Sequence, residues 1–157
     1  MDAVMEIHQL TPQFFIDYPS AQYPELMHKQ GRPYNCLLID LHMDYCICIP
    51  FRSEIQHKNA YMFKQSVRSQ RKKSGLDYSK TVIVTDDRYF STATAVIDRD
   101  EYMETSANIK RITSEIVRYV DDYIAHVTGN ITLHPRDFSR RYNYSTLKYF
   151  HKELGIE

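Results

Sequence analysis

The segment PFRSEIQHKNAYMFK, residues 50–64, gathers cationic and hydrogen-bonding side chains directly after an apolar run. The side chains with useful chemistry are Arg52, Ser53, His57, Lys58 and Lys64. His57 follows Ser53 by four residues, so a single helical turn would bring the hydroxyl and the imidazole to one face. The residue types and their spacing therefore predict a polar site where a strand ends at Pro50.

These residue types suit the cleavage of RNA without a metal ion. That reaction needs the 2′-hydroxyl deprotonated, the charge on the phosphorane oxygens stabilised, and the departing 5′-oxygen protonated. The planar guanidinium of Arg52 suits the second task, and His57 suits either proton transfer, as base or as acid. Ser53 is expected to hydrogen-bond phosphate rather than act as a nucleophile, since no Ser-His-Asp pattern is evident. The alternative is a surface histidine with no catalytic role.

Charge is unevenly distributed along a chain that is neutral overall, with 20 basic and 20 acidic residues. The stretch from Arg52 to Lys80 contains eight basic residues and only two acidic ones, Glu54 and Asp77, which gives a local surplus of six positive charges. One basic face on a neutral protein is compatible with binding a polyanion.

Residues 66–75, SVRSQRKKSG, have little apolar content and predict a mobile, solvated loop. Such charge runs are usually solvated loops and nothing more. Interleaved aromatic residues favour RNA instead, because aromatic rings can stack on unpaired bases while cations hold phosphates. The residues expected to contact RNA are Lys58, Lys64, Arg68, Arg71, Lys72 and Lys73, with the rings of Tyr61 and Phe63.

Short apolar runs before residue 98 predict strands. The expected strands are Tyr34–His42, Tyr45–Pro50, Ala60–Lys64, Lys80–Thr85 and Ala93–Ile97. Met43 and Asp44 allow a tight reversal, so the first two runs should form a hairpin.

Three helices are expected outside these strands. Thr11 before Pro12 predicts a short helix over Pro12–Asp17. Apolar residues at intervals of three and four from Ile109 to Val127 predict a long amphipathic helix that ends near Gly129. A final amphipathic helix is expected over Tyr144–Leu154.

The predicted fold class is α+β, a compact antiparallel and partly closed β-barrel with the long helix and a further C-terminal helix packed on it. At 157 residues, 43% of them apolar, the chain is expected to form one domain over residues 1–157. No Gly-rich phosphate loop or G-x-S-x-G motif is present, which argues against nucleotide hydrolysis and esterase chemistry.

The three cysteines, Cys36, Cys46 and Cys48, all lie in strand-like sequence and are expected to be buried, reduced thiols. Further ligands at suitable spacing are not evident, so neither a metal site nor another cofactor is expected. No apolar run of membrane-spanning length and no secretory signal are visible. A soluble, cytoplasmic protein without a membrane association is expected.

Three stretches, taken in order, carry a resemblance to a known family. They are RPYNCLLIDL, CICIPFRSEIQHKNAYMFKQSVRS and SGLDYSKTVIVTDD. In this pattern the chain resembles the toxins of type III toxin–antitoxin systems, in the CptN-like branch of the ToxN/AbiQ endoribonuclease family. The likeness covers most of residues 32–87 and extends more weakly through the long helix and the C-terminal segment.

The resemblance implies a fold similar to the MazF and Kid toxins and a metal-independent endoribonuclease activity. Cellular RNA substrates would be cut to leave 2′,3′-cyclic phosphate and 5′-hydroxyl ends. The resemblance also implies a small pseudoknot antitoxin RNA, which the toxin cuts from a repeated precursor and which then inhibits it. Toxin and RNA would assemble into a closed hetero-oligomer.

By the same resemblance, Arg32 occupies the place of an active-site lysine before the first barrel strand, and His28 that of an active-site tyrosine. Arg52 and Ser53 occupy the place of a Thr-Ser pair after the second strand. His57 lies near the lysine that follows in those relatives, but out of register with it. The expected roles are phosphorane stabilisation by the two arginines, a hydrogen bond from Ser53 to phosphate, and proton transfer by His57.

Two other functions remain open from the sequence. One is a non-catalytic RNA-binding barrel that uses the same groove without cutting. The other is a protein-interaction domain whose aromatic groove holds a peptide.

Overall fold

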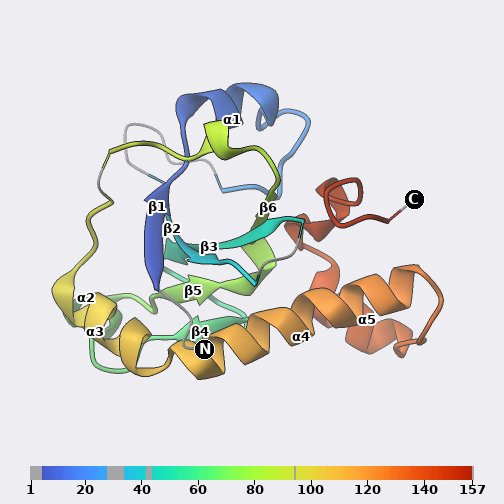
Figure 1. Ribbon diagram of the computed structural model, residues 1–157. Helices are drawn as coiled ribbons and strands as arrows, with labels where there is room; N and C mark the ends of the chain where they lie inside the picture. Colours follow the sequence, from blue (N-terminus) through green and yellow to red (C-terminus); the bar gives the residue numbers. More distant parts are fainter. Residues whose placement is uncertain (1–4, 28–33, 42–43, 94, 157) are drawn as a thin grey trace.

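The computed structural model describes residues 5–27, 34–41, 44–93 and 95–156. It shows an α+β fold with a six-stranded antiparallel sheet and several helices (Figure 1). The strands are β1 (Glu6–Gln9), β2 (Asn35–Ile39), β3 (Cys46–Arg52), β4 (Ala60–Met62), β5 (Gly75–Asp77) and β6 (Val82–Val84). Their order is β1-β2-β3-β5-β4, with β6 also paired to β3. Within the described residues no pairing closes this sheet, so the expected barrel is not confirmed.

The β2–β3 hairpin confirms the strongest sequence prediction. Leu38 faces Cys48 and Cys36 faces Pro50 in an antiparallel register. The expected end of the strand at Pro50 is wrong, because β3 continues to Arg52 and pairs there with β5. Met43, half of the predicted reversal, lies outside the described residues.

Strand β3 is the centre of the sheet because it is paired along both edges. Strand β2 covers one edge, while β6 and β5 follow each other along the opposite edge. A single 3₁₀ turn over Tyr78–Lys80 separates β5 from β6, so the segment leaves the sheet and returns to it within a few residues.

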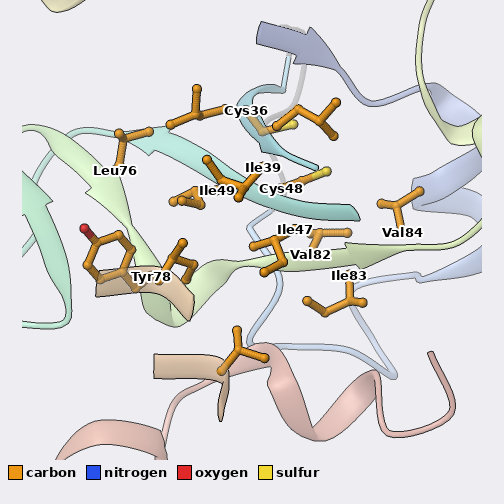
Figure 2. Packing of buried hydrophobic residues seen from close by; sticks show 14 of the residues in the cluster. Cys36, Ile39, Ile47, Cys48, Ile49, Leu76, Tyr78, Val82, Ile83 and Val84 are labelled. Atoms are coloured by element: carbon orange, nitrogen blue, oxygen red, sulfur yellow. The ribbon is translucent and has the colours of Figure 1, made fainter. Parts of the chain in front are cut away.

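The core lies on both faces of this sheet, between α1 (Pro12–Asp17) with its flanking turns and the long helix α4 (Ile109–Val127) (Figure 1). Figure 2 shows Val84 and Ile83 of β6 on opposite sides of their strand, and both are buried. Cys36 and Cys48 are buried free thiols, as predicted, whereas Cys46 is half-buried. Burial on both faces explains why β3 is apolar from Cys46 to Phe51 instead of alternating.

Two predicted helices are confirmed, α1 over Pro12–Asp17 and α4 over Ile109–Val127. The predicted C-terminal helix is wrong in extent, because the chain forms only a 3₁₀ turn over Thr146–Tyr149 followed by further turns. The described residues also form the α-helices α2 (Val67–Arg71), α3 (Arg99–Ala107) and α5 (Pro135–Tyr142). None of the helices in the described residues is long and apolar enough to cross a membrane.

The predicted strand over Ala93–Ile97 is wrong, since its described residues, 93 and 95–97, have no regular structure. The predicted strand over Ala60–Lys64 is shortened to β4, and the one over Lys80–Thr85 to β6. The basic segment 66–75 is not an unstructured loop either. It contains α2 and the start of β5, and the buried hydroxyls of Ser66 and Ser74 both bond to the buried carboxylate of Glu101.

Candidate functional site

A buried aspartate, Asp77, is the centre of the polar cluster at the end of β3. Its side chain has no exposed surface. Arg52 Nη1 donates to Asp77 Oδ2 at 2.7 Å, and His57 Nε2 lies 3.2 Å from the same oxygen. Ser79 donates to Asp77 Oδ1 through its hydroxyl at 2.6 Å and its backbone N–H at 3.0 Å. Four donors therefore satisfy one carboxylate.

Sheet pairing brings these residues together from distant parts of the sequence. Arg52 at the end of β3 is directly opposite Gly75 at the start of β5, two residues before Asp77. Gly75 is required here, because a Cβ on it would lie 2.1 Å from the carbonyl oxygen of Tyr61 on the neighbouring strand. The close approach of β4, β5 and β3 sets the position of Asp77.

The loop over residues 53–59 returns His57 to this cluster. Its backbone is tied to the sheet by Ile55 N–H donating to the Lys73 carbonyl, and by Tyr78 N–H donating to the Asn59 carbonyl. Glu54 has a positive φ of 59° and makes the sharp turn after β3. The residues between Ser53 and His57 form no helical turn, so the predicted one-turn arrangement is wrong.

Burial acts to raise the pKa of Asp77, but hydrogen bonds from His57, Ser79 and Arg52 outweigh it and lower the pKa below the ordinary value. The carboxylate is therefore charged at neutral pH. It holds the Arg52 guanidinium by one nitrogen, and the Arg52 side chain keeps 32% of its surface exposed. Within the described residues Arg52 makes no other hydrogen bond through its guanidinium, which leaves the remaining N–H donors for an anion.

The hydrogen bonds around His57 define its tautomer. Asn59 N–H donates to Nδ1 at 3.1 Å, so this nitrogen carries no proton. The proton is on Nε2, which faces the Asp77 carboxylate and lies 3.3 Å from the Ser79 hydroxyl. Both ring nitrogens are thus occupied within the protein, although the side chain is still 32% exposed.

Lys80, three residues after Asp77, extends the cluster on the side of the C-terminal segment. Its ammonium donates to the Tyr144 carbonyl at 2.9 Å. Burial lowers its pKa, and the positive charge of Arg52 lowers it further, while the negative charge of Asp77 acts in the opposite direction. Lys80 is therefore part of the same electrostatic environment as the Arg52–Asp77 pair.

An open cleft of about 510 Å³ adjoins the cluster at His57. It separates the 53–59 loop from α5 and from the chain that precedes α5. Its lining residues are His57, Lys58, Asn59, Leu133, Asp137, Arg140 and Arg141.

The predicted site residues fall into three groups. Arg52 and His57 are brought together on Asp77, as described above. Ser53 lies between them in the sequence and is half-buried, but among the described contacts it is not one of the donors to Asp77. Arg32 and His28 lie outside the described residues, and their predicted roles stay predictions.

The predicted RNA-binding cations are in different environments. Lys58, Lys64, Arg71, Lys72 and Lys73 are exposed. Arg68 is instead paired with the buried carboxylate of Glu101, which gives it a structural partner. The prediction that Tyr61 and Phe63 stack on bases is wrong for this fold, because both rings are buried in the core, at 3% and 5% exposure.

Sequence reasoning missed Asp77, Ser79 and Lys80 as site residues. A signal was present, since Asp77 is one of only two acids in the basic stretch between Arg52 and Lys80. An acid in that position has cations close to it in sequence and follows an apolar residue, which favours a buried ion pair.

Comparison of the chain with protein-family models, with curated proteins and with solved structures found no significant match. Among the described residues, no group of three or more histidine, cysteine or acidic side chains has a metal-binding arrangement. The functional argument therefore depends on the cluster itself.

Proposed function

We propose that this protein is a metal-independent endoribonuclease that cuts single-stranded or looped RNA by transesterification, and that it is the toxin of a type III toxin–antitoxin system. The observation that supports this most directly is the convergence of Arg52 and His57 on one buried carboxylate beside a basic cleft. The family resemblance of residues 32–87 supports the same class, including inhibition by a small pseudoknot antitoxin RNA in a closed complex.

In the proposed reaction the 2′-oxygen attacks the adjacent phosphorus while the bond from phosphorus to the 5′-oxygen breaks. The proton of the 2′-hydroxyl passes to a base, and an acid gives a proton to the departing 5′-oxygen. The free N–H groups of Arg52 bind the non-bridging oxygens, where negative charge develops in the transition state. Ser53 donates a hydrogen bond to the same phosphate, and His57 carries out one proton transfer.

The tautomer of His57 adds a condition to this mechanism. Neither ring nitrogen has a free lone pair, because Asn59 N–H occupies Nδ1 and the Nε2 proton faces Asp77. Proton transfer therefore requires substrate to displace one of these partners. Arg52 can assist, since a phosphate that attracts its guanidinium weakens the hold of Asp77 on the cluster.

The same observation favours a second candidate, a non-catalytic RNA-binding module. If substrate displaces neither partner, Asp77 and His57 only brace the 53–59 loop, and the cleft binds RNA without cutting it. The two functions differ in their product, so one experiment separates them.

The experiment is incubation of the purified protein with RNA in the presence of a chelator, followed by detection of new 5′-hydroxyl and 2′,3′-cyclic phosphate ends. The proposal requires such ends to form with the chelator present. Bound RNA that stays intact would establish the binding module instead.

His57→Gln tests the proton transfer without removing the brace. The glutamine amide can still donate to Asp77 near the position of Nε2, but it cannot exchange a proton. We expect the variant to fold and its cleavage rate to fall by about 10²-fold or more. The control is Lys152→Ala, which removes an exposed lysine from a separate hollow next to Tyr45. Full activity in His57→Gln would exclude His57 from the chemistry.

A further inference from the structure

We infer that the cleft between the 53–59 loop and α5 binds the sugar-phosphate backbone of a nucleotide adjacent to the one that is cut. This inference rests on the proposed function and deepens it, because it extends the RNA-binding surface beyond Lys58 to residues that the sequence analysis had not indicated. Arg140 and Arg141, from a helix far along the chain, belong to this surface.

Position is the first argument. His57 lines the cleft and also belongs to the Asp77 cluster, so any occupant of the cleft lies against the proposed reaction site. The amide of Asn59 donates to the Arg140 carbonyl at 3.1 Å and ties the two walls together. A volume of about 510 Å³ is within the usual range of small-ligand sites, roughly 300–1,000 Å³.

Charge is the second argument. Three cations, Lys58, Arg140 and Arg141, line the cleft against one acid, Asp137, which leaves a surplus of two. Asp137 is paired with Arg140, and both side chains are exposed, so water screens this pair. Within the described part of the chain, Lys58 has no ion-pair partner.

Preorganisation is the third argument. Arg141 donates through Nη1 to Asp122 at 3.0 Å, and its guanidinium lies over the ring of Tyr142, 5.0 Å from the ring centre. These contacts fix the guanidinium while leaving most of its N–H donors unused. A fixed, partly exposed guanidinium binds a phosphate without a further entropy cost for its own ordering.

The lining also decides which part of a nucleotide is bound. Among the lining residues that the structure describes, Leu133 is the one apolar side chain and His57 the one with an aromatic ring. Both ring nitrogens of His57 are held by other groups of the protein, and this described lining has no phenylalanine or tyrosine to form the broad stacking platform that single-strand binders use. The cleft is therefore suited to phosphate and ribose, and its contribution to binding should be the same for every base.

The test is binding of short, fluorescent single strands of 2′-O-methyl RNA, which cannot be cleaved because the attacking hydroxyl is blocked. Affinities for oligo-U and oligo-A are measured over a range of salt concentrations by anisotropy. Lys58→Ala and Arg140→Ala should each weaken binding roughly fivefold, equally for both sequences, and reduce the slope of log K against log salt by about 0.7. Lys152→Ala should leave both quantities unchanged.

Two results would overturn the inference. Unchanged affinity and salt slope in both cleft variants would remove RNA from the cleft. A loss confined to one base sequence would indicate a base pocket instead of a backbone site. The assay needs no cleavage, so it separates the two proposals. Cleft-dependent binding by a protein that never cuts RNA would refute the nuclease activity alone. Cleavage by a protein whose RNA affinity is unchanged in both cleft variants would refute the cleft alone.

Discussion

Replacing Asp77 with asparagine tests whether one buried carboxylate assembles the site. Asparagine has the same shape, but only one of its two polar atoms accepts hydrogen bonds. If the amide oxygen keeps the two hydrogen bonds from Ser79, the amide N–H₂ faces the donors of Arg52 and His57. Donors then face donors, so both of these hydrogen bonds are lost. A change of tautomer at His57 gives no relief, because a proton on Nδ1 would then face Asn59 N–H.

The size of the effect follows from the two bonds that are lost. Each is a hydrogen bond to a charged group, which contributes about 1.5–3 kcal/mol. Arg52 and His57 each keep 32% of their side-chain surface exposed, so the lower limit applies and the sum is about 3 kcal/mol. With an m-value near 2 kcal/mol/M in urea, the unfolding midpoint should fall by about 1.5 M.

The pH dependence has a defined sign. The folded-state pKa of Asp77 is lowered below the ordinary value of 3.8. Its contribution to stability is therefore fully present well above pH 3.8 and is lost as the pH falls through the folded-state pKa. The difference in unfolding free energy between the wild type and Asp77→Asn should stay constant near neutral pH and shrink in acid.

The assay is urea unfolding of both proteins across this pH range, with Asp137→Asn as the matched control. Asp137 is 54% exposed and paired with an exposed arginine, so its loss should cost at most about 1 kcal/mol. If Asp77→Asn behaves like this control, or if its deficit does not shrink in acid, the buried carboxylate does not hold the cluster as described.

Two further substitutions test how the site is supported. Gly75→Ala should destabilise the fold by about 3 kcal/mol or more, because its Cβ would overlap the Tyr61 carbonyl oxygen; an unchanged melting temperature would contradict the close approach of β4 and β5. Arg68→Ala should cost about 3–5 kcal/mol in urea unfolding, since it leaves the buried Glu101 without its cation, whereas Arg71→Ala should stay within about 0.5 kcal/mol. Equal losses would show that the Arg68 pair is dispensable.

The features that the sequence predicted correctly are those whose information is local. Helix α4 was found because Ile112, Ile116 and Val120 recur at helical spacing and all three are fully buried. Its end was found because Gly129 takes a positive φ of 81°, a conformation that favours glycine. The β2–β3 hairpin likewise needs only two adjacent apolar runs.

The features that were missed depend on partners far away in the sequence. Strand β5 has one strongly apolar residue, Leu76, and becomes a strand because β3 and β4 pair with it on either side. The expected strand at Ala93–Ile97 has suitable residues, but its described residues, 93 and 95–97, pair with no strand. Pairing partners of this kind are not encoded within a short window.

The same distinction applies to the site. Arg52 and His57 could be grouped because they are five positions apart, whereas Asp77 lies 25 residues from Arg52 and reaches it only through sheet pairing. The rings of Tyr61 and Phe63 were expected at the RNA surface because cations surround them in the sequence. In the sheet both rings face the core, where their large apolar area is buried and stabilises the fold.

Several cations of this neutral protein have carboxylate partners within the described residues. Arg68 is paired with the buried Glu101, and Lys72 lies 3.5 Å from Glu54. Lys58 and Lys73, both exposed, stand at the two ends of the 53–59 loop, because the Lys73 carbonyl accepts a bond from Ile55 N–H. A polyanion bound by both lysines would lie along this loop, which begins after Arg52 and carries His57. Within the described residues, the positions of these two lysines therefore agree with the path for RNA that the proposed function needs.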